Sequence, residues 1–141
     1  MSETAWESNT LQTPRTAPAE PVRLPPPEAV VAGHICLDVI PLLVGGAVQF
    51  TPGHTIEAGP AVFATGGAVS NTGLALHKLG VSTRLMGKVG DDLFGQTILR
   101  IVAGYGQELA AGMVVSPGAS TSYSIILSSP SADRMLIHAP G

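Results

Sequence analysis

The sequence predicts an α/β fold, and three observations support this class. An apolar run rich in Val, Ile and Leu covers residues 29–43, as in a central strand that is buried on both faces. Two adjacent glycines, Gly66 and Gly67, then precede a helical pattern, which a glycine at position 80 would end. A second strand and a capped helix follow over residues 82–103. Strands and helices that alternate in this order are typical of an α/β layer.

The composition indicates a single soluble domain. The chain has 141 residues, of which 45% are hydrophobic and 12% are charged. A net charge of -3 provides no basic surface for the phosphates of a nucleic acid. No segment approaches the ~20 apolar residues of a membrane span, and the first residues lack the order of a secretory signal. We therefore expect a cytoplasmic protein with neither a nucleic acid nor a membrane as partner.

Residues 1–28 predict a disordered, Pro-rich tail. They hold six of the twelve prolines and few aliphatic side chains, so they cannot bury enough apolar surface to offset the entropy of ordering. The tail is interpreted as a plain linker, with a polyproline II segment at Pro25–Pro27 as the alternative. The ordered domain then covers residues 29–141.

Asp38 interrupts the apolar run of residues 29–43, shortly before Pro41. A carboxylate at the end of a buried strand has to be hydrogen-bonded, paired with a cation or exposed in a cleft. Open α/β sheets bind ligands beyond the carboxyl ends of their strands, which favours a functional Asp38. An aspartate that caps a turn explains the same position, and both interpretations stay open on position alone.

The middle of the sequence predicts a glycine turn and a helix. The glycines and prolines of residues 44–60 favour short strands and turns, and residues 61–65 form a brief strand. The helix that follows has an apolar face formed by Val69, Leu76 and Leu79. Gly73 and Ala75 are small enough for close packing, and Gly80 ends the helix.

The next segment predicts a strand from Ser82 to Gly90, followed at once by Asp91 and Asp92. Either carboxylate can accept hydrogen bonds from the free amides of the next helix, so capping is the leading explanation and catalysis the lesser one. The helix covers residues 93–103 and buries an apolar face that consists of Phe94, Ile98, Ile101 and Val102.

The last part of the sequence predicts strands and turns. A short strand covers residues 113–115, and a β-hairpin covers residues 121–138. The chain then closes on Pro140 and Gly141, which is unusual for a complete parallel-sheet domain. We expect such a half-built sheet to be marginally stable unless another chain covers it.

The histidines and the cysteine do not form a metal-binding pattern. None of the four histidines pairs with another ligand at the spacing of a zinc finger or an HExxH motif. His34 and Cys36 come nearest, but an ordinary surface or core histidine is the simpler interpretation. Cys36 lies in an apolar run, where a buried and inert thiol is expected.

Several motifs, in this order, resemble the PfkB or ribokinase-like carbohydrate kinases. They are G-H-I-C-L-D (residues 33–38), G-G-x-x-x-N (66–71) followed by L-G (79–80), G-x-V-G-D-D-x-F-G (87–95) and T-S-Y-S-I-I-L…H-A-P-G (121–141). The resemblance extends from about Val30 to Gly141. It implies a ribokinase-like, mostly parallel sheet with helices and a small β lid, incomplete relative to the family fold.

The resemblance implies sugar-binding roles for four residues. Asp38 matches the family's aspartate that binds sugar hydroxyls, a role that suits an ionised carboxylate. Gly66 and Gly67 belong to the glycine-rich motif, in which the backbone of Gly67 lies against the sugar, and Asn71 matches the asparagine whose amide contacts it. Ala68 stands where ribokinases often carry lysine, so one contact of those enzymes is absent.

The resemblance also implies a lid and a missing half. Residues 42–64 and the hairpin of residues 121–138 would form a lid that excludes water from the sugar. Family members are more than twice as long, and their second half carries the ATP site and the catalytic aspartate of a G-A-G-D motif. This sequence has no G-A-G-D and no GxxxxGK. ATP and Mg²⁺ are therefore expected for the whole enzyme, with no catalytic, cofactor or metal residue among these 141.

Three hypotheses on function follow. In the first, the chain is the N-terminal, sugar-binding portion of a carbohydrate kinase, and it is inactive alone. In the second, it is a non-catalytic sugar-binding or protein-interaction fragment that uses the lid sheet. Two copies of the chain would then form a dimer through that sheet. The third is a dinucleotide-binding domain, but GGAVSN does not match GxGxxG and no acidic residue follows at the expected distance.

Overall fold

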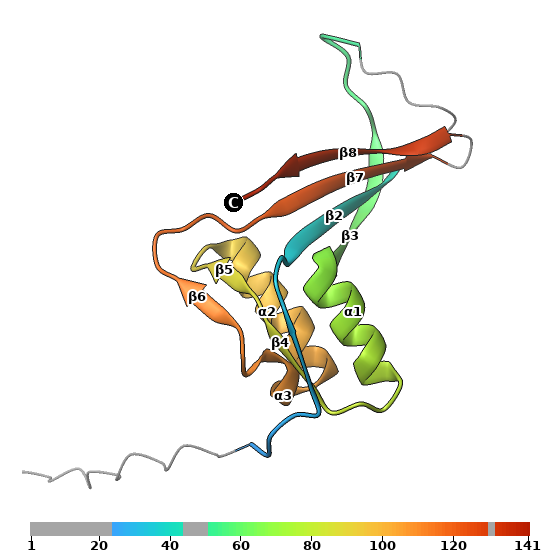
Figure 1. Cartoon of the computed structure of the whole chain (residues 1–141). Coiled ribbons are helices and arrows are strands. Elements are labelled where there is room, and N and C mark those ends of the chain that lie inside the picture. The colour runs from blue at the N-terminus through green and yellow to red at the C-terminus, as the bar shows by residue number, and fades with distance from the viewer. Residues whose placement is uncertain (1–23, 44–50, 130–131) are drawn as a thin grey trace, which may run out of the picture.

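The structure is a computed structural model that describes residues 24–43, 51–129 and 132–141 (Figure 1). The predicted tail therefore falls largely outside the described residues, as does part of the segment 44–60. The elements are β1 (Ala29–Ala32), β2 (Cys36–Leu43), β3 (Ala58–Gly66), α1 (Gly67–Lys78), β4 (Thr83–Met86), β5 (Lys88–Gly90), α2 (Leu93–Tyr105), α3 (Gln107–Ala110), β6 (Val114–Ser116), β7 (Tyr123–Ser129) and β8 (Ala132–Ala139).

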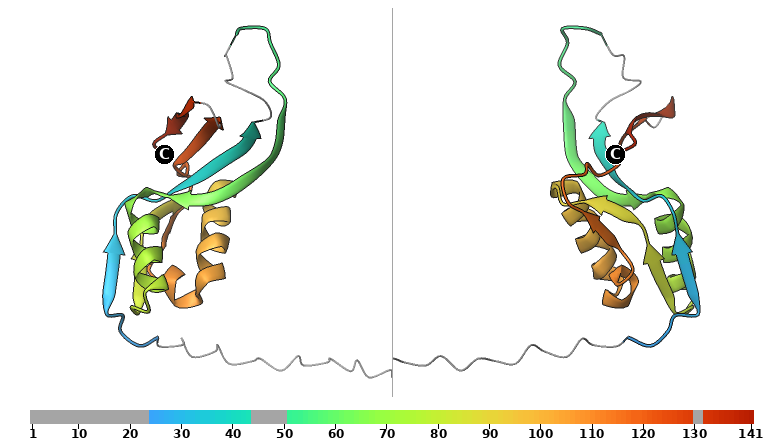
Figure 2. Two further views of the ribbon diagram at one scale, coloured as in Figure 1. Left: turned by 90° about the vertical axis from the view of Figure 1, so that its right-hand side faces the viewer. Right: turned by 60° about the vertical axis from the view of Figure 1, so that its left-hand side comes forward.

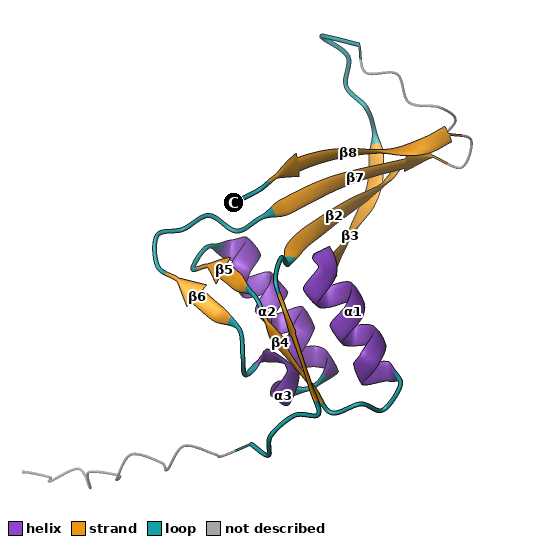
Figure 3. Ribbon diagram, viewed as in Figure 1, coloured by secondary structure: helices purple, strands orange, loops and turns teal. Residues whose placement is uncertain are grey.

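The elements form two parts, as Figures 1 and 3 show. In the first part, β1 pairs with β4 and β5 pairs with β6, all in parallel, and α1 and α2 lie on one side of these strands (Figure 2). In the second part, four strands form a mixed sheet in the order β3-β2-β7-β8. The α/β class and the small additional sheet were thus predicted correctly.

The apolar run of residues 29–43 is two strands and not the one strand that the sequence predicted. β1 runs parallel to β4, whereas β2 runs antiparallel to β3 and parallel to β7. The chain changes sheets at Gly33, whose φ of 141° is a conformation that favours glycine. Asp38 consequently lies inside β2 and not at the end of a strand.

The four-stranded sheet contains the predicted hairpin. β7 and β8 pair antiparallel, with Ser124 opposite His138. The strand predicted for residues 61–65 is longer and covers Ala58–Gly66 as β3, which pairs with β2. Residues 51–57 form a turn and a loop before it.

Helix α1 packs closely on β4 because Gly73 has no side chain. A Cβ atom at Gly73 would overlap the side chain of Leu85, which is fully buried. The helix ends as predicted at Gly80, whose φ is +86° and whose N–H donates to the carbonyl of His77 (2.9 Å). The prediction was wrong for two side chains: Leu79 is 79% exposed because it follows the last turn, and Ala75 faces solvent.

The predicted strand of residues 82–90 is interrupted at Gly87 and forms two strands. Of these, β4 pairs with β1 and β5 pairs with β6. Helix α2 follows as predicted and is two residues longer at its C-terminus, while the short helix α3 was not predicted. A single apolar core lies between the strands and the helices; its buried members are Ile35, Leu37, Val69, Leu85, Val89, Ile98, Val102 and Leu109. Within the described residues, no helix is long and apolar enough to span a membrane.

Two glycines of α2 make a matched pair for testing this packing. A Cβ atom at Gly95 would overlap the carbonyl oxygen of Gly90, whereas a Cβ atom at Gly104 meets nothing within 4 Å. We expect Gly95→Ala to lower the free energy of unfolding by about 1–3 kcal/mol or more through overpacking. We expect Gly104→Ala to raise it by up to about 1 kcal/mol, because alanine is the better helix former. Urea unfolding measures both changes, and equal effects of the two substitutions would contradict the close approach.

Candidate functional site

The two predicted glycines lie where β3 ends and α1 begins, and their neighbours leave no room for side chains. A Cβ atom at Gly66 would overlap the carboxylate of Asp38. At Gly67, φ is +86° and a Cβ atom would lie 2.5 Å from the carbonyl oxygen of His34. The structure therefore brings Asp38, Gly66 and Gly67 together.

The turn presents the N-terminus of α1. Gly66 is the N-cap residue and has no side chain that could accept from the first amides of the helix. The N–H of Val69 donates to the carbonyl of His34 (3.1 Å), and the first turn has no acidic residue. An oxygen-rich ligand placed on this turn would meet the positive end of the helix.

Asn71, the fourth predicted residue, lies on α1 one turn after Gly67, and its side chain is exposed. In the part of the chain that the structure describes, no hydrogen bond joins Asn71 to Asp38. Its role in binding stays a prediction.

The strand register adds polar side chains that the sequence reasoning missed. Asp38 of β2 lies opposite Ser124 of β7, and Ser124 lies opposite His138 of β8, so the three share one face of the sheet. Ser124 Oγ and His138 Nδ1 are 3.0 Å apart. The alternation in T-S-Y-S-I-I-L placed Ser122 and Ser124 on one face. It could not reveal which strand lies beside them.

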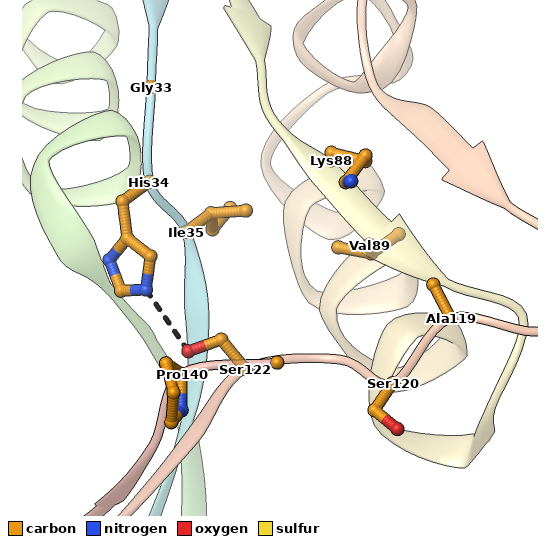
Figure 4. A pocket seen from close by; sticks show the side chains of 10 residues that line it. Gly33, His34, Ile35, Lys88, Val89, Ala119, Ser120, Ser122 and Pro140 are labelled. Atoms are coloured by element: carbon orange, nitrogen blue, oxygen red, sulfur yellow. Dashed lines mark hydrogen bonds between the residues drawn. The ribbon is translucent and has the colours of Figure 1, made fainter.

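His34 completes this cluster. Its Nε2 lies 3.0 Å from Ser122 Oγ, and its ring packs edge-on against that of His138 with 5.8 Å between the ring centroids. Ser122 Oγ in turn donates to the carbonyl of Ala139 (3.0 Å). Figure 4 shows His34 turned toward Ser122.

Cys36 is buried, as expected, and its thiol lies 3.6 Å from Asp38 Oδ1. Burial raises the pKa of the Cys36 thiol, and the neighbouring Asp38 carboxylate raises it further. A protonated thiol that donates to Asp38 is a poor metal ligand. No group of three His, Cys, Asp or Glu side chains that could hold a metal ion occurs among the described residues.

A cavity of about 460 Å³ opens beside His34 (Figure 4). It lies where the chain after β1 separates from β5, and its lining includes His34, Ile35, Lys88, Ser122 and Gly141. Open α/β sheets bind ligands where neighbouring strands separate at their carboxyl ends. The cavity therefore extends the polar cluster toward the α/β part of the molecule.

Asp91 and Asp92 are structural in this fold, which agrees with the leading interpretation of the sequence. Asp92 is the N-cap of α2 and accepts from the N–H of Gly95 (2.8 Å). It also accepts from the N–H and the hydroxyl of Thr121 (2.8 and 2.6 Å). Asp91 accepts from the N–H of Gly118 (3.0 Å). These hydrogen bonds, that of the Thr121 hydroxyl first, hold the pKa of Asp92 below its ordinary value.

Comparisons with known proteins agree on one family. A model described as "pfkB family carbohydrate kinase" matches residues 27–140. Fructokinase-1 of Oryza sativa subsp. japonica is 31% identical over 125 residues, which are 79% of this chain and 36% of that protein. Fructokinase-2 of Solanum lycopersicum is 29% identical over 76% of this chain and 34% of that protein. The chain thus spans about a third of the length of these relatives.

Solved structures give the same result. A provisionally assigned ribokinase from Agrobacterium tumefaciens superposes with a TM-score of 0.69 at 26% identity, over 79% of this chain and 35% of that one. Ribokinase of Arabidopsis thaliana, solved with ribose and ATP, superposes with a TM-score of 0.63 at 20% identity, over 80% of this chain and 36% of that one. The second likeness is evidence for the fold alone.

The lowered pKa of Asp92 predicts a pH dependence of stability. Because the pKa is lower in the folded than in the unfolded state, this carboxylate stabilises the fold above its unfolded pKa of about 4. That contribution is lost as the pH falls through the folded pKa. We expect Asp92→Asn to lower the free energy of unfolding at pH 7 by about 1–3 kcal/mol, and by much less near pH 3. Urea unfolding at both pH values tests this, with the exposed Asp133→Asn as control; equal losses at the two pH values would contradict it.

Proposed function

Because the chain belongs to the pfkB family of carbohydrate kinases, we propose that residues 29–141 are the sugar-binding part of an enzyme that transfers the γ-phosphoryl group of ATP to a sugar hydroxyl. The observation that carries this proposal is the Asp38 carboxylate packed against the turn of Gly66 and Gly67. This arrangement places a hydroxyl acceptor beside a backbone that a ligand can approach closely.

The chemistry of sugar binding follows from these residues. An ionised carboxylate accepts hydrogen bonds from two hydroxyls, and such charge-assisted bonds are the stronger kind. The first amides of α1 can donate to sugar oxygens, since Gly66 leaves them without a side-chain cap. The amide of Asn71 can both donate and accept. Together they would fix the position of the hydroxyl that receives the phosphoryl group, and phosphoryl transfer depends mainly on such positioning.

We propose a ketohexose such as fructose as the substrate. The curated relatives described above are named fructokinases and include one at 31% identity. Ala68, which follows the two glycines, stands where ribokinases often carry lysine, and this argues against ribose.

A site for ATP or Mg²⁺ is not part of this proposal for residues 29–141. Neither G-A-G-D nor GxxxxGK occurs in the sequence, and the described residues hold no metal-ligating group of three. In the whole enzyme, ATP would provide the phosphoryl group and Mg²⁺ would neutralise the charge of its phosphates. A reducing, cytoplasmic setting suits the single cysteine, Cys36.

The four-stranded sheet is proposed to act as the lid, with β2 and β7 at its centre. Its two faces differ, because successive residues of a strand point to opposite sides. Asp38, Ser124 and His138 share one face, which also carries the exposed Val62 and Leu136. Phe63 of β3 and Ile137 of β8 share the other face and are 52% and 50% exposed. The apolar face suits a second copy of the chain.

This apolar face also supports the second candidate function, a non-catalytic interaction fragment. Light scattering and a sugar titration distinguish the two. A defined oligomer that binds no sugar favours the interaction fragment, whereas sugar binding that depends on Asp38 favours the kinase portion.

Sugar binding should depend on Asp38. We expect the 141-residue chain to bind D-fructose weakly and Asp38→Ala to weaken binding at least about tenfold, because a charged acceptor contributes about 1.5–3 kcal/mol. Asp133→Ala, at an exposed carboxylate of the same sheet, is the control and should bind normally. Isothermal titration of a panel of sugars provides the measurement, and equal binding by Asp38→Ala would contradict the proposed site.

Phosphoryl transfer should be absent from the 141-residue chain. We expect no ADP formation above background in an ATP-coupled assay with D-fructose, D-ribose and inosine, because the chain has no G-A-G-D segment. Turnover that is lost in Asp38→Ala would overturn this expectation and would show that other residues of the chain supply the base.

A further inference from the structure

The side chain of His34 is exposed and has neighbours on three sides. Its Nε2 lies 3.0 Å from Ser122 Oγ, and the ring of His138 packs edge-on against it. On the third side lies the glycine turn: a Cβ atom at Gly67 would be 2.9 Å from His34 Nδ1. The backbone is fixed as well, because the carbonyl of His34 accepts from Val69 N–H (3.1 Å).

The hydrogen bonds of Ser122 indicate which nitrogen of His34 carries the proton. A serine hydroxyl has one proton to donate, and Ser122 donates it to the carbonyl of Ala139 (3.0 Å). With that proton on the Ala139 carbonyl, Ser122 Oγ accepts from His34 Nε2, which then carries a proton. In the neutral imidazole, Nδ1 is then an acceptor with a lone pair.

This lone pair lies at the same turn as the Asp38 carboxylate. Asp38 packs against Gly66 and His34 Nδ1 packs against Gly67, and the Cα atoms of consecutive residues are about 3.8 Å apart. Two hydrogen-bond acceptors thus flank two adjacent residues that have no side chains. Both side chains also lie near His138, whose ring packs edge-on against His34 and whose Nδ1 is 3.0 Å from the Oγ of Ser124, the residue opposite Asp38.

We infer that His34 is a second hydroxyl-binding residue of the sugar site, with Nδ1 as the accepting atom and with its tautomer fixed by Ser122. The site then selects a sugar that donates one hydroxyl to Asp38 and another to His34. This inference rests on the sugar-binding role proposed above and adds a residue to it. It also gives Ser122 a positioning role, because Ser122 acts on the sugar only through His34.

The tautomer is tested by long-range ¹H–¹⁵N NMR of the 141-residue chain labelled with ¹⁵N-histidine. We expect a protonated Nε2 and an unprotonated Nδ1 for His34 at a pH where the ring is neutral. Ser122→Ala removes the acceptor at Nε2 and should give a mixture of the two tautomers. A proton on Nδ1 of the unsubstituted chain would overturn the inference.

Addition of D-fructose tests the contact itself. We expect the Nδ1 resonance of His34 to shift as the sugar saturates, whereas the resonances of His77, which lies in the last turn of α1, stay unchanged. This measurement needs no substitution and stands even if a variant fails to fold. A His34 resonance that does not move while the sugar binds would overturn the inference.

Substitutions separate binding from a structural role. We expect His34→Ala to bind D-fructose about five- to tenfold more weakly. His34→Asn should recover part of this loss, since its amide oxygen can accept a hydrogen bond near the position of Nδ1, and His77→Ala should bind normally. Urea unfolding of each variant identifies losses caused by misfolding, and a folded His34→Ala that binds normally would overturn the inference.

The outcomes also distinguish this inference from the proposal on which it rests. If no sugar of the panel binds, both are wrong. If D-fructose binds and requires Asp38 but leaves His34 unaffected, the sugar-binding role stands and only the inference about His34 is wrong.

Discussion

The Asp92 carboxylate provides the interaction on which the rest of the structure depends, because it joins segments that are far apart in the sequence. It caps α2 through the N–H of Gly95 and accepts from both the N–H and the hydroxyl of Thr121. The Thr121 hydroxyl in turn accepts from the N–H of Gly90 (2.9 Å), at the end of β5. Because Thr121 leads directly into β7, these four hydrogen bonds fix the small sheet to the α/β part. Gly90 and Gly95 lie so close to Thr121 and its neighbours that a side chain at either position would overlap them. The motif G-x-V-G-D-D-x-F-G is thus explained as a structural requirement.

The elements that local pattern determines could be predicted from the sequence. The glycine at position 80 ended α1 and Asp92 capped α2, because both act within one turn of the helix. The break at Gly33 was missed, because a run of apolar residues has the same sequence pattern whether its strands belong to one sheet or to two. Helix α3 was also missed, because four residues carry too little periodicity to be recognised.

The residues of the candidate site likewise divide into those that the sequence could indicate and those that it could not. Asp38 and the two glycines stood out because a carboxylate within an apolar run and a pair of glycines both need an explanation. Ser122 and His138 did not stand out, and His34 was considered only as a metal ligand, because the contacts among them depend on the pairing of β7 with β2 and β8, which sequence spacing does not reveal. Together these residues form a polar cluster on one face of the small sheet, and that cluster continues into the cavity beside His34.

The long separation between His34 and Ser122 has a consequence for the order in which the nascent chain can fold. These two residues hydrogen-bond across 88 positions of sequence. During translation, β2 and β3 can pair and α1 can form as soon as the ribosome has released them, because their partners are close in sequence. The polar cluster stays incomplete until β7 emerges and pairs with β2. An early nascent chain therefore carries the aspartate and the glycine turn, while the histidine gains its hydrogen-bond partner only near the end of synthesis of these residues.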